Sequence, residues 1–202
     1  MSTVYNSIID RKKLEKISKY YSLLPDLGSE TNDQIINKKL EYHNKNDISY
    51  NIFSPLFTEI LGEHDLDVGA YKESSNPYPI HTDSASHHEY WNDRITRRGG
   101  EEKHNMALLV PLVEGPEFKT VVFDAYSEEF FKEPDPKILI DDNGLDPDEF
   151  RHCQQCVTRL PLEISYEWKL GDILTWDRNQ LHASADFARH GLIKKFLIFF
   201  ML

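Results

Sequence analysis

Apolar positions follow a helical period at the start of the chain. Over residues 7–24 they fall roughly on one helical face, and Pro25 and Gly28 then interrupt the pattern. These positions are Ile8, Leu14, Ile17, Tyr21 and Leu24. A weaker version of the pattern predicts a second helix over residues 31–42. Ser54 and Pro55 have the form of an N-cap and a first-turn proline, which predicts a third helix over 56–61.

After Gly62 the apolar residues instead form short runs typical of β-strands, separated by prolines, glycines and polar clusters. Helical segments do not alternate with them, which favours a sandwich or barrel over a parallel α/β sheet. The prediction is a mainly β protein in which flanking helices support a jelly-roll core. The predicted strands lie at residues 66–71, 106–112, 119–123, 160–166, 172–176 and 193–202.

The spacing of these segments also predicts the domain organisation. At 202 residues we expect one domain, with a helical support at 1–62 and a strand-rich core at 63–202. Two long insertions, 84–105 and 126–158, interrupt the core. Insertions of that length in a compact domain often carry function.

Composition excludes several classes of function. A net charge of −11 argues against the clustered basic face of a nucleic-acid-binding protein and against attraction to anionic membranes. No apolar run is long enough to span a bilayer, and the first residues lack the apolar region of a signal peptide. The two cysteines cannot form a disulfide framework. We therefore expect a cytoplasmic protein that binds neither nucleic acid nor membrane.

One short motif carries most of the chemical information. His81 and Asp83 are two residues apart, so on an extended strand both side chains point to the same face. Among the later histidines, His182 is the best third partner because it directly follows an apolar strand. Two histidines and one carboxylate on one face of a metal leave coordination positions open, an arrangement suited to non-haem Fe(II) and oxygen chemistry.

A lysine pair near the end of the chain adds a second signal. Lys194 and Lys195 open the last apolar strand, where a cation is costly unless an anion meets it. A small dicarboxylate bound to the metal would be such an anion. Adjacent strand residues face opposite sides, so only one of the two lysines can face the site, and the other is explained as an edge lysine that discourages aggregation. We favour Lys195 as the inward residue, because its inward neighbour would be Leu197 rather than the bulkier Phe196.

Together these segments resemble the Fe(II)/2-oxoglutarate-dependent oxygenases, in particular the phytanoyl-CoA dioxygenase-like or prolyl-hydroxylase-like branch. The similarity rests on the HTD motif at 81–83 and on the segment 171–200, in which a Gly-Asp-Ile-Leu strand precedes a histidine and a later basic residue. It covers the β-rich part of the chain from about Leu66 onward. The family pattern usually has arginine where this chain has lysine.

The resemblance implies a double-stranded β-helix, a cupin-like jelly roll, and a role for each matching residue. His81, Asp83 and His182 would bind the iron, Lys195 or Lys194 would bind the distal carboxylate of 2-oxoglutarate, and Ser184 could hydrogen-bond this cosubstrate. The expected cofactors are Fe(II), 2-oxoglutarate and O₂. The expected reaction decarboxylates 2-oxoglutarate to succinate and hydroxylates a small molecule that the sequence does not identify.

Other residues remain open to two interpretations. His87 and His88 match no ligand position and are either solvated loop residues or substrate contacts. Trp91 and Arg97 belong to a basic insertion that could form a lid over an anionic or aromatic substrate, or an ordinary charged loop. Cys153 and Cys156 lack the second pair that a zinc site requires and are interpreted as free thiols. The acidic stretch 141–150 lacks the glutamate that completes a calcium loop and is interpreted as a turn.

Two further hypotheses compete with the oxygenase. A cupin-type metal enzyme that does not use 2-oxoglutarate would favour a His-x-His pair with a glutamate, whereas this chain has His-x-Asp. A jelly-roll binding module without catalytic activity would need neither intact ligand positions nor the lysine. The sequence leaves the oligomeric state open.

Overall fold

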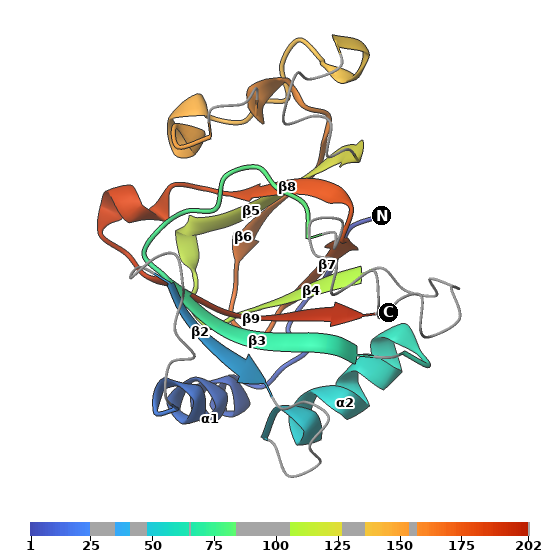
Figure 1. Cartoon of the computed structure of the whole chain (residues 1–202), viewed down its shortest axis with the longest axis vertical. Helices are drawn as coiled ribbons and strands as arrows, with labels where there is room; N and C mark the ends of the chain where they lie inside the picture. Colours follow the sequence, from blue (N-terminus) through green and yellow to red (C-terminus); the bar gives the residue numbers. More distant parts are fainter. Residues whose placement is uncertain are drawn as a thin grey trace.

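Two antiparallel sheets face each other in the computed structural model, with two helices against the outer face of the larger one (Figure 1). The structure describes residues 1–24, 35–40, 48–64, 66–83, 106–126, 136–153 and 157–201. The elements are β1 (Thr3–Tyr5), α1 (Arg11–Ser22), β2 (Ile35–Leu40), α2 (Ile48–Leu61), β3 (Leu66–Ser74), β4 (Met106–Pro111), β5 (Gly115–Tyr126), β6 (Leu162–Trp168), β7 (Ile173–Asp177), β8 (Gln180–Ser184) and β9 (Lys194–Met201).

The strand order is that of a jelly roll. The larger sheet runs β1-β7-β4-β9-β3-β2 and the smaller one β6-β5-β8, with every pairing antiparallel. β9, the last strand, lies inside the larger sheet between β4 and β3. The prediction of a mainly β, double-stranded β-helix core with flanking helices is confirmed.

Alternation along β9 explains how the layers are built. Phe196 and Ile198 point between the sheets and join a core that includes residues of β5, β6 and β7. Leu197 and Phe199 point the other way, into a core shared with the two helices. Because side chains alternate with period two, a strand buried on both faces is apolar at almost every position.

The helices cover the outer face of the larger sheet through aromatic contacts. In α2, the rings of Phe53 and Phe57 lie 4.9 and 5.0 Å from the ring of Phe199 on β9. In α1, Ile17 and Tyr21 are fully buried in the same core. These helices therefore pack on the outer face of the larger sheet and do not line the space between the sheets.

The second long insertion covers the outer face of the smaller sheet. Its described part contains the short 3₁₀ helices Pro136–Ile138 and Pro147–Phe150, and Val157–Arg159 follows the gap at 154–156. Phe150 and Val157 pack on Val121, Phe123 and other residues of β5 and β8. The acidic stretch is a turn, as expected, in which the Asp142 side chain accepts a hydrogen bond from the Gly144 backbone at 2.9 Å. The structure does not describe the first insertion.

Three expectations about the elements were wrong. Residues 35–40 form strand β2, because their backbone pairs with β3 over six residues and this long-range pairing overrides a weak helical pattern. The helix expected at 56–61 begins at Ile48 and includes Pro55, and the burial of Phe53 and Phe57 stabilises the helix although Pro55 cannot donate a backbone hydrogen bond. The N-terminal region is therefore not a purely helical support, since β1 and β2 belong to the larger sheet.

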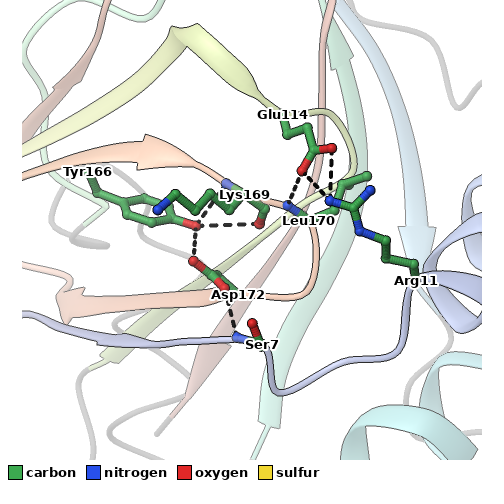
Figure 2. Close-up of polar contacts among 7 residues, drawn as sticks. All are labelled: Ser7, Arg11, Glu114, Tyr166, Lys169, Leu170 and Asp172. Carbon is green, nitrogen blue, oxygen red and sulfur yellow. Dashed lines mark hydrogen bonds and ion pairs between the residues drawn. The ribbon is translucent and has the colours of Figure 1, made fainter.

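The start of the chain is tied to the turn between β6 and β7 (Figure 2). Buried Asp172 accepts a hydrogen bond from the Ser7 backbone at 2.7 Å and one from the Tyr166 hydroxyl at 3.1 Å. The Ile9 backbone donates to the Gly171 carbonyl at 2.9 Å. Gly171 has φ +97°, and a Cβ atom there would lie 2.7 Å from the Ile9 carbonyl oxygen, so only glycine fits.

A second contact fastens α1 to the sheet. The Arg11 guanidinium pairs with Glu114 at 2.8 Å, and Glu114 also accepts a hydrogen bond from the Leu170 backbone at 3.2 Å (Figure 2).

No helix in the described part of the chain is long and apolar enough to cross a membrane. The division into a single domain of 202 residues stays a prediction.

Candidate metal centre

Strand β8 brings the two predicted histidine ligands together. His81 lies in the segment after β3, which pairs with β8 through one antiparallel bridge to His182. The two residues exchange both backbone hydrogen bonds at 3.0 Å, and their ring centroids are 4.1 Å apart. Directly opposed residues in an antiparallel pair point to the same face, so both imidazoles face the space between the sheets.

Asp83 completes the group from the same segment. Its backbone donates to the Arg178 carbonyl at 2.8 Å, and its carboxylate accepts a hydrogen bond from the indole of Trp176 at 3.2 Å. The carboxylate oxygen Oδ2 lies 3.3 Å from Nε2 of His182. One potential ligand atom from each of His81, Asp83 and His182 lies within 4.8 Å of the others.

Backbone carbonyls orient both imidazole rings. Nδ1 of His81 lies 2.8 Å from the Pro79 carbonyl, and Nδ1 of His182 lies 3.1 Å from the Gln180 carbonyl. A carbonyl oxygen only accepts, so each Nδ1 carries the hydrogen and each Nε2 keeps its lone pair. This is the arrangement by which metal-binding histidines are normally held.

The charge state of His81 also suits a ligand. Burial, followed by the proximity of His182, lowers the pKa of His81 to about 3 despite the neighbouring carboxylate of Asp83. The ring is therefore neutral at physiological pH, which is the form that binds a metal.

These residues fit a divalent metal. Two imidazole nitrogens and one carboxylate oxygen form the 2-His-1-carboxylate donor set of non-haem Fe(II) sites. Over the described ranges of the chain, this is the one cluster of three or more histidine, cysteine or acidic side chains close enough to share an ion.

The metal-ligand cluster opens into a pocket between the two sheets. Its walls combine the three ligands and Trp176 with two lysines, three other polar residues and a set of apolar side chains. The further residues that line it are Lys72, Tyr78, Leu109, Thr120, Ala183, Ser184, Lys194, Phe196, Ile198 and Phe200.

The inward-facing lysine is Lys194, so our preference for Lys195 was wrong. Lys194 is 4% exposed and lines the pocket, whereas the side chain of Lys195 is 33% exposed and pairs with Glu73 at 3.1 Å. The inward neighbour of the site lysine is Phe196, whose ring packs against Trp168 at 5.7 Å. The bulk of Phe196 forms the pocket wall and does not exclude the lysine from it.

Lys194 is held by aromatic rings rather than by an acid. Its ammonium lies 4.5 Å from the ring centroid of Trp168, 5.0 Å from that of Phe196 and 5.4 Å from that of Tyr78. Burial, followed by repulsion from Lys72, lowers the pKa of Lys194 to about 7. Cation–π contacts offset only part of the desolvation cost, so this ammonium still lacks a full counter-charge.

Ser184 lines the same pocket but already has partners. Its hydroxyl accepts a hydrogen bond from the Tyr78 backbone at 2.7 Å and reaches the Tyr78 carbonyl at 3.4 Å. The imidazole of His152 approaches the same carbonyl at 3.2 Å. Ser184 thus fixes the segment that leads from β3 to His81, and a cosubstrate contact for it stays a prediction.

The sequence interpretation missed several pocket residues. Lys72 on β3 is opposite Phe196 on β9, so it shares the inner face with Lys194. In the sequence, Lys72 is an ordinary polar residue of an alternating strand. Its position in the pocket can be inferred only once the pairing of β3 with β9 is known. Thr120 and Trp176 likewise reach the pocket only through the tertiary structure.

The remaining predicted residues are distributed as follows. His87, His88, Trp91, Arg97 and Cys156 lie outside the described residues. Cys153 is a free, buried thiol, as expected, and burial raises its pKa to about 11, which makes it unreactive.

The two facing sheets with this metal-binding geometry define a fold class, the double-stranded β-helix on which Fe(II)/2-oxoglutarate oxygenases are built. No family model and no curated protein matches the sequence. Comparison of the structure with solved structures does show similarity, although sequence identity is low. The similarity therefore establishes the fold alone.

Three of the similar structures illustrate this. HygX from Streptomyces hygroscopicus, solved with nickel, 2-oxoglutarate and hygromycin B bound, has a TM-score of 0.59 at 11% identity over 99% of this chain and 81% of that one. The epimerase SnoN from nogalamycin biosynthesis, solved with Fe³⁺, α-ketoglutarate and nogalamycin RO, has a TM-score of 0.56 at 13% identity over 100% and 78%. A 2OG-Fe(II) oxygenase family oxidoreductase from Burkholderia pseudomallei has a TM-score of 0.55 at 11% identity, over 99% of this chain and 83% of that one.

Proposed function

We propose that this protein is an Fe(II)- and 2-oxoglutarate-dependent oxygenase that oxidises a small molecule. One observation carries the proposal: a 2-His-1-carboxylate cluster and a buried lysine without an acidic partner among the described residues face the same pocket. Either feature alone has structural explanations. Together they provide a metal site and a buried ammonium in one pocket. One ligand can coordinate the metal through one end and pair with the ammonium through a carboxylate at its other end.

The ligand roles follow from the contacts. His81, Asp83 and His182 hold the metal, and the carbonyls of Pro79 and Gln180 fix the ring orientations. Trp176 donates to Asp83 and steadies the carboxylate. When bound, Fe(II) with 2-oxoglutarate and O₂ supplies the oxidising equivalent, with succinate and CO₂ as products.

Lys194 provides the charge for the distal carboxylate of 2-oxoglutarate. Its ammonium lies in an apolar environment, where a charge-assisted hydrogen bond is stronger than in water. The three aromatic rings around it exclude water and leave its charge available to the ligand. Lys195, turned away toward Glu73, takes no part.

The substrate class follows from the proposal and the comparisons. HygX and SnoN were solved with small molecules bound, which supports a small-molecule substrate here. Two of the similar structures are an epimerase, SnoN, and a carbocyclase, SnoK, so this fold hosts oxidative outcomes other than hydroxylation. We propose hydroxylation as the outcome for this chain, with the first insertion, which contains His87, Trp91 and Arg97, contributing substrate contacts.

The proposal is tested with purified protein, Fe(II), ascorbate and 2-oxoglutarate. We expect slow conversion of 2-oxoglutarate to succinate without added substrate, and a metal affinity that falls at least tenfold in His81→Ala and Asp83→Ala, because each removes a ligand. His190→Ala serves as the matched control, since His190 is exposed and lies outside the pocket. A wild-type protein that binds neither Fe(II) nor 2-oxoglutarate would contradict the proposal.

A further inference from the structure

A second lysine in the pocket has no role in the function proposed above. Lys72 lies on β3, diagonal to Lys194 across the β3–β9 pair, and its ammonium is 5.8 Å from the Tyr78 ring centroid. The ammonium of Lys194 lies 5.4 Å from the centroid of the same ring. Both lysines therefore line one small pocket. Their mutual repulsion is unfavourable unless a bound anion offsets it.

Counter-charge on the pocket wall is scarce. In the described part of the chain, the one acidic residue that lines the pocket is Asp83, and metal binding would engage its carboxylate. Neither Lys72 nor Lys194 forms an ion pair with a described residue. With a divalent metal and the dianionic cosubstrate bound, the pocket lysines and Asp83 leave one positive charge uncompensated.

The two lysines differ in depth. Lys194 is almost completely buried among three aromatic rings, which suits the distal carboxylate of a ligand whose other end binds the metal. Lys72 is less deeply buried than Lys194. Burial lowers the pKa of Lys72, and the nearby carboxylate of Asp83 acts in the opposite direction. Lys72 is therefore the more accessible of the two pocket lysines, which suits a second ligand.

We propose that Lys72 binds an anionic group, a carboxylate or a phosphate, of the substrate. This inference rests on the proposed function, because it assigns Lys194 to the cosubstrate and leaves Lys72 for the second ligand. Tyr78 lines the same pocket, and its buried hydroxyl has no hydrogen-bond acceptor among the described residues, so it offers a further donor to that anion. The substrate class is then a small organic acid or phosphorylated molecule.

The test uses the Mn(II) form of the whole protein saturated with 2-oxoglutarate, which binds ligands without turnover. Two probes replace the unknown substrate: acetate, followed by the relaxation of its methyl protons, and inorganic phosphate, followed by ³¹P relaxation. Mn(II) enhances relaxation only of nuclei bound close to it. We expect saturable enhancement for at least one probe, and the probe that responds distinguishes a carboxylate from a phosphate site.

Variants assign the anion to its lysine. Lys72→Met should weaken probe binding at least tenfold, and Lys72→Arg should retain it, because a charge-assisted hydrogen bond contributes about that factor. Lys13→Met is the matched control, since it removes the same charge from an exposed position on α1. In Lys72→Met, the affinity for 2-oxoglutarate measured by calorimetry should stay within about threefold of wild type.

Three outcomes overturn the inference. Equal enhancement in wild type and Lys72→Met, or none in wild type, means that Lys72 binds no anion near the metal. A loss of 2-oxoglutarate affinity as large in Lys72→Met as in Lys194→Met makes Lys72 part of the cosubstrate site instead. If wild-type protein binds neither Mn(II) nor 2-oxoglutarate, the proposed function itself fails, which the calorimetric data register separately.

Discussion

At the residue scale, Lys194 is the side chain whose chemistry depends most on its surroundings. Burial and the nearby Lys72 lower its pKa from about 10.5 to about 7, while Asp83 acts in the opposite direction. The unfolded chain then binds more protons than the unliganded fold between these pH values. The stability of the unliganded protein should accordingly rise as the pH increases from about 7 toward 10.

The same shift predicts that the protein takes up a proton when it binds 2-oxoglutarate. At a pH of about 8.5 the free Lys194 is mostly neutral, and a bound carboxylate favours its charged form, so uptake should approach one proton. Calorimetry in buffers of different ionisation enthalpy measures this number. In Lys194→Met the uptake should vanish and the affinity should fall about ten- to hundredfold.

Lys195→Met is the control for this experiment. Its ammonium is paired with Glu73 on the opposite face of β9, so both proton uptake and affinity should match wild type. Proton uptake that persists in Lys194→Met and disappears in Lys195→Met would reverse the assignment of the two lysines.

How far the residues of the site could be predicted depended on their spacing. The shared face of His81 and Asp83 could be predicted, because residues i and i+2 point to the same side of any extended backbone. The choice between Lys194 and Lys195 could not be predicted, because β9 is apolar on both faces. Each lysine is followed, two residues later, by a large apolar residue on its own face. Lys72 had no distinguishing pattern at all.

At the element scale, the segment from Tyr78 to Asp83 is the part of the fold that positions His81 and Asp83, two of the three proposed metal ligands. It has a single bridge to β8 and is otherwise held by side chains and turn backbone. Ser184 engages the Tyr78 backbone, and Arg178 accepts from and donates to the Asp83 backbone. A short segment with few ladder hydrogen bonds depends on such contacts for its precision.

Ser184→Ala should therefore weaken the metal site without changing a ligand. The substitution removes the acceptor of the Tyr78 N–H, and an unsatisfied buried donor costs about 1–3 kcal/mol. We expect a lower free energy of unfolding in urea and a several-fold lower metal affinity. Ser22→Ala, at the exposed end of α1, should change neither quantity.

This experiment also separates two roles of Ser184. If its hydroxyl serves the cosubstrate rather than the Tyr78 segment, Ser184→Ala weakens 2-oxoglutarate binding while metal affinity and stability stay at wild-type values.

Among the elements, β2 shows why local patterns are not sufficient. Its weak helical periodicity competes with the open edge of β3, and six backbone pairs decide the outcome. Strand β8 was missed as a strand because it is five residues long and carries polar residues, yet it holds His182. Short strands depend on their neighbours more than on their own propensity.

At the scale of the whole molecule, the layers isolate the pocket from the structural support. Helices cover the outside of the larger sheet and the second insertion covers the outside of the smaller one, so both outer faces are buried without using the space between the sheets. The proposed metal ligands then lie on an interior surface that is supported by packing on both outer faces of the sheets.

Metal binding should consequently raise stability without being required for folding. Mn(II) or Zn(II) at a hundredfold excess over its dissociation constant should add about 2.7 kcal/mol to the free energy of unfolding and raise Tm by a few degrees. Removal of the metal with EDTA should leave the far-ultraviolet circular dichroism spectrum unchanged. Loss of the β signal on chelation would show instead that the fold needs the ion.

The sequence by itself determined the features that follow from local geometry. Apolar runs predicted a strand-rich core, and the His-x-Asp spacing predicted that His81 and Asp83 share one face, because both depend on periods of a few residues. The tertiary structure alone decided which lysine faces the pocket, that Lys72 joins it and that residues 35–40 form a strand. These features depend on which strands pair and in which register, and that is set by contacts between residues far apart in the chain.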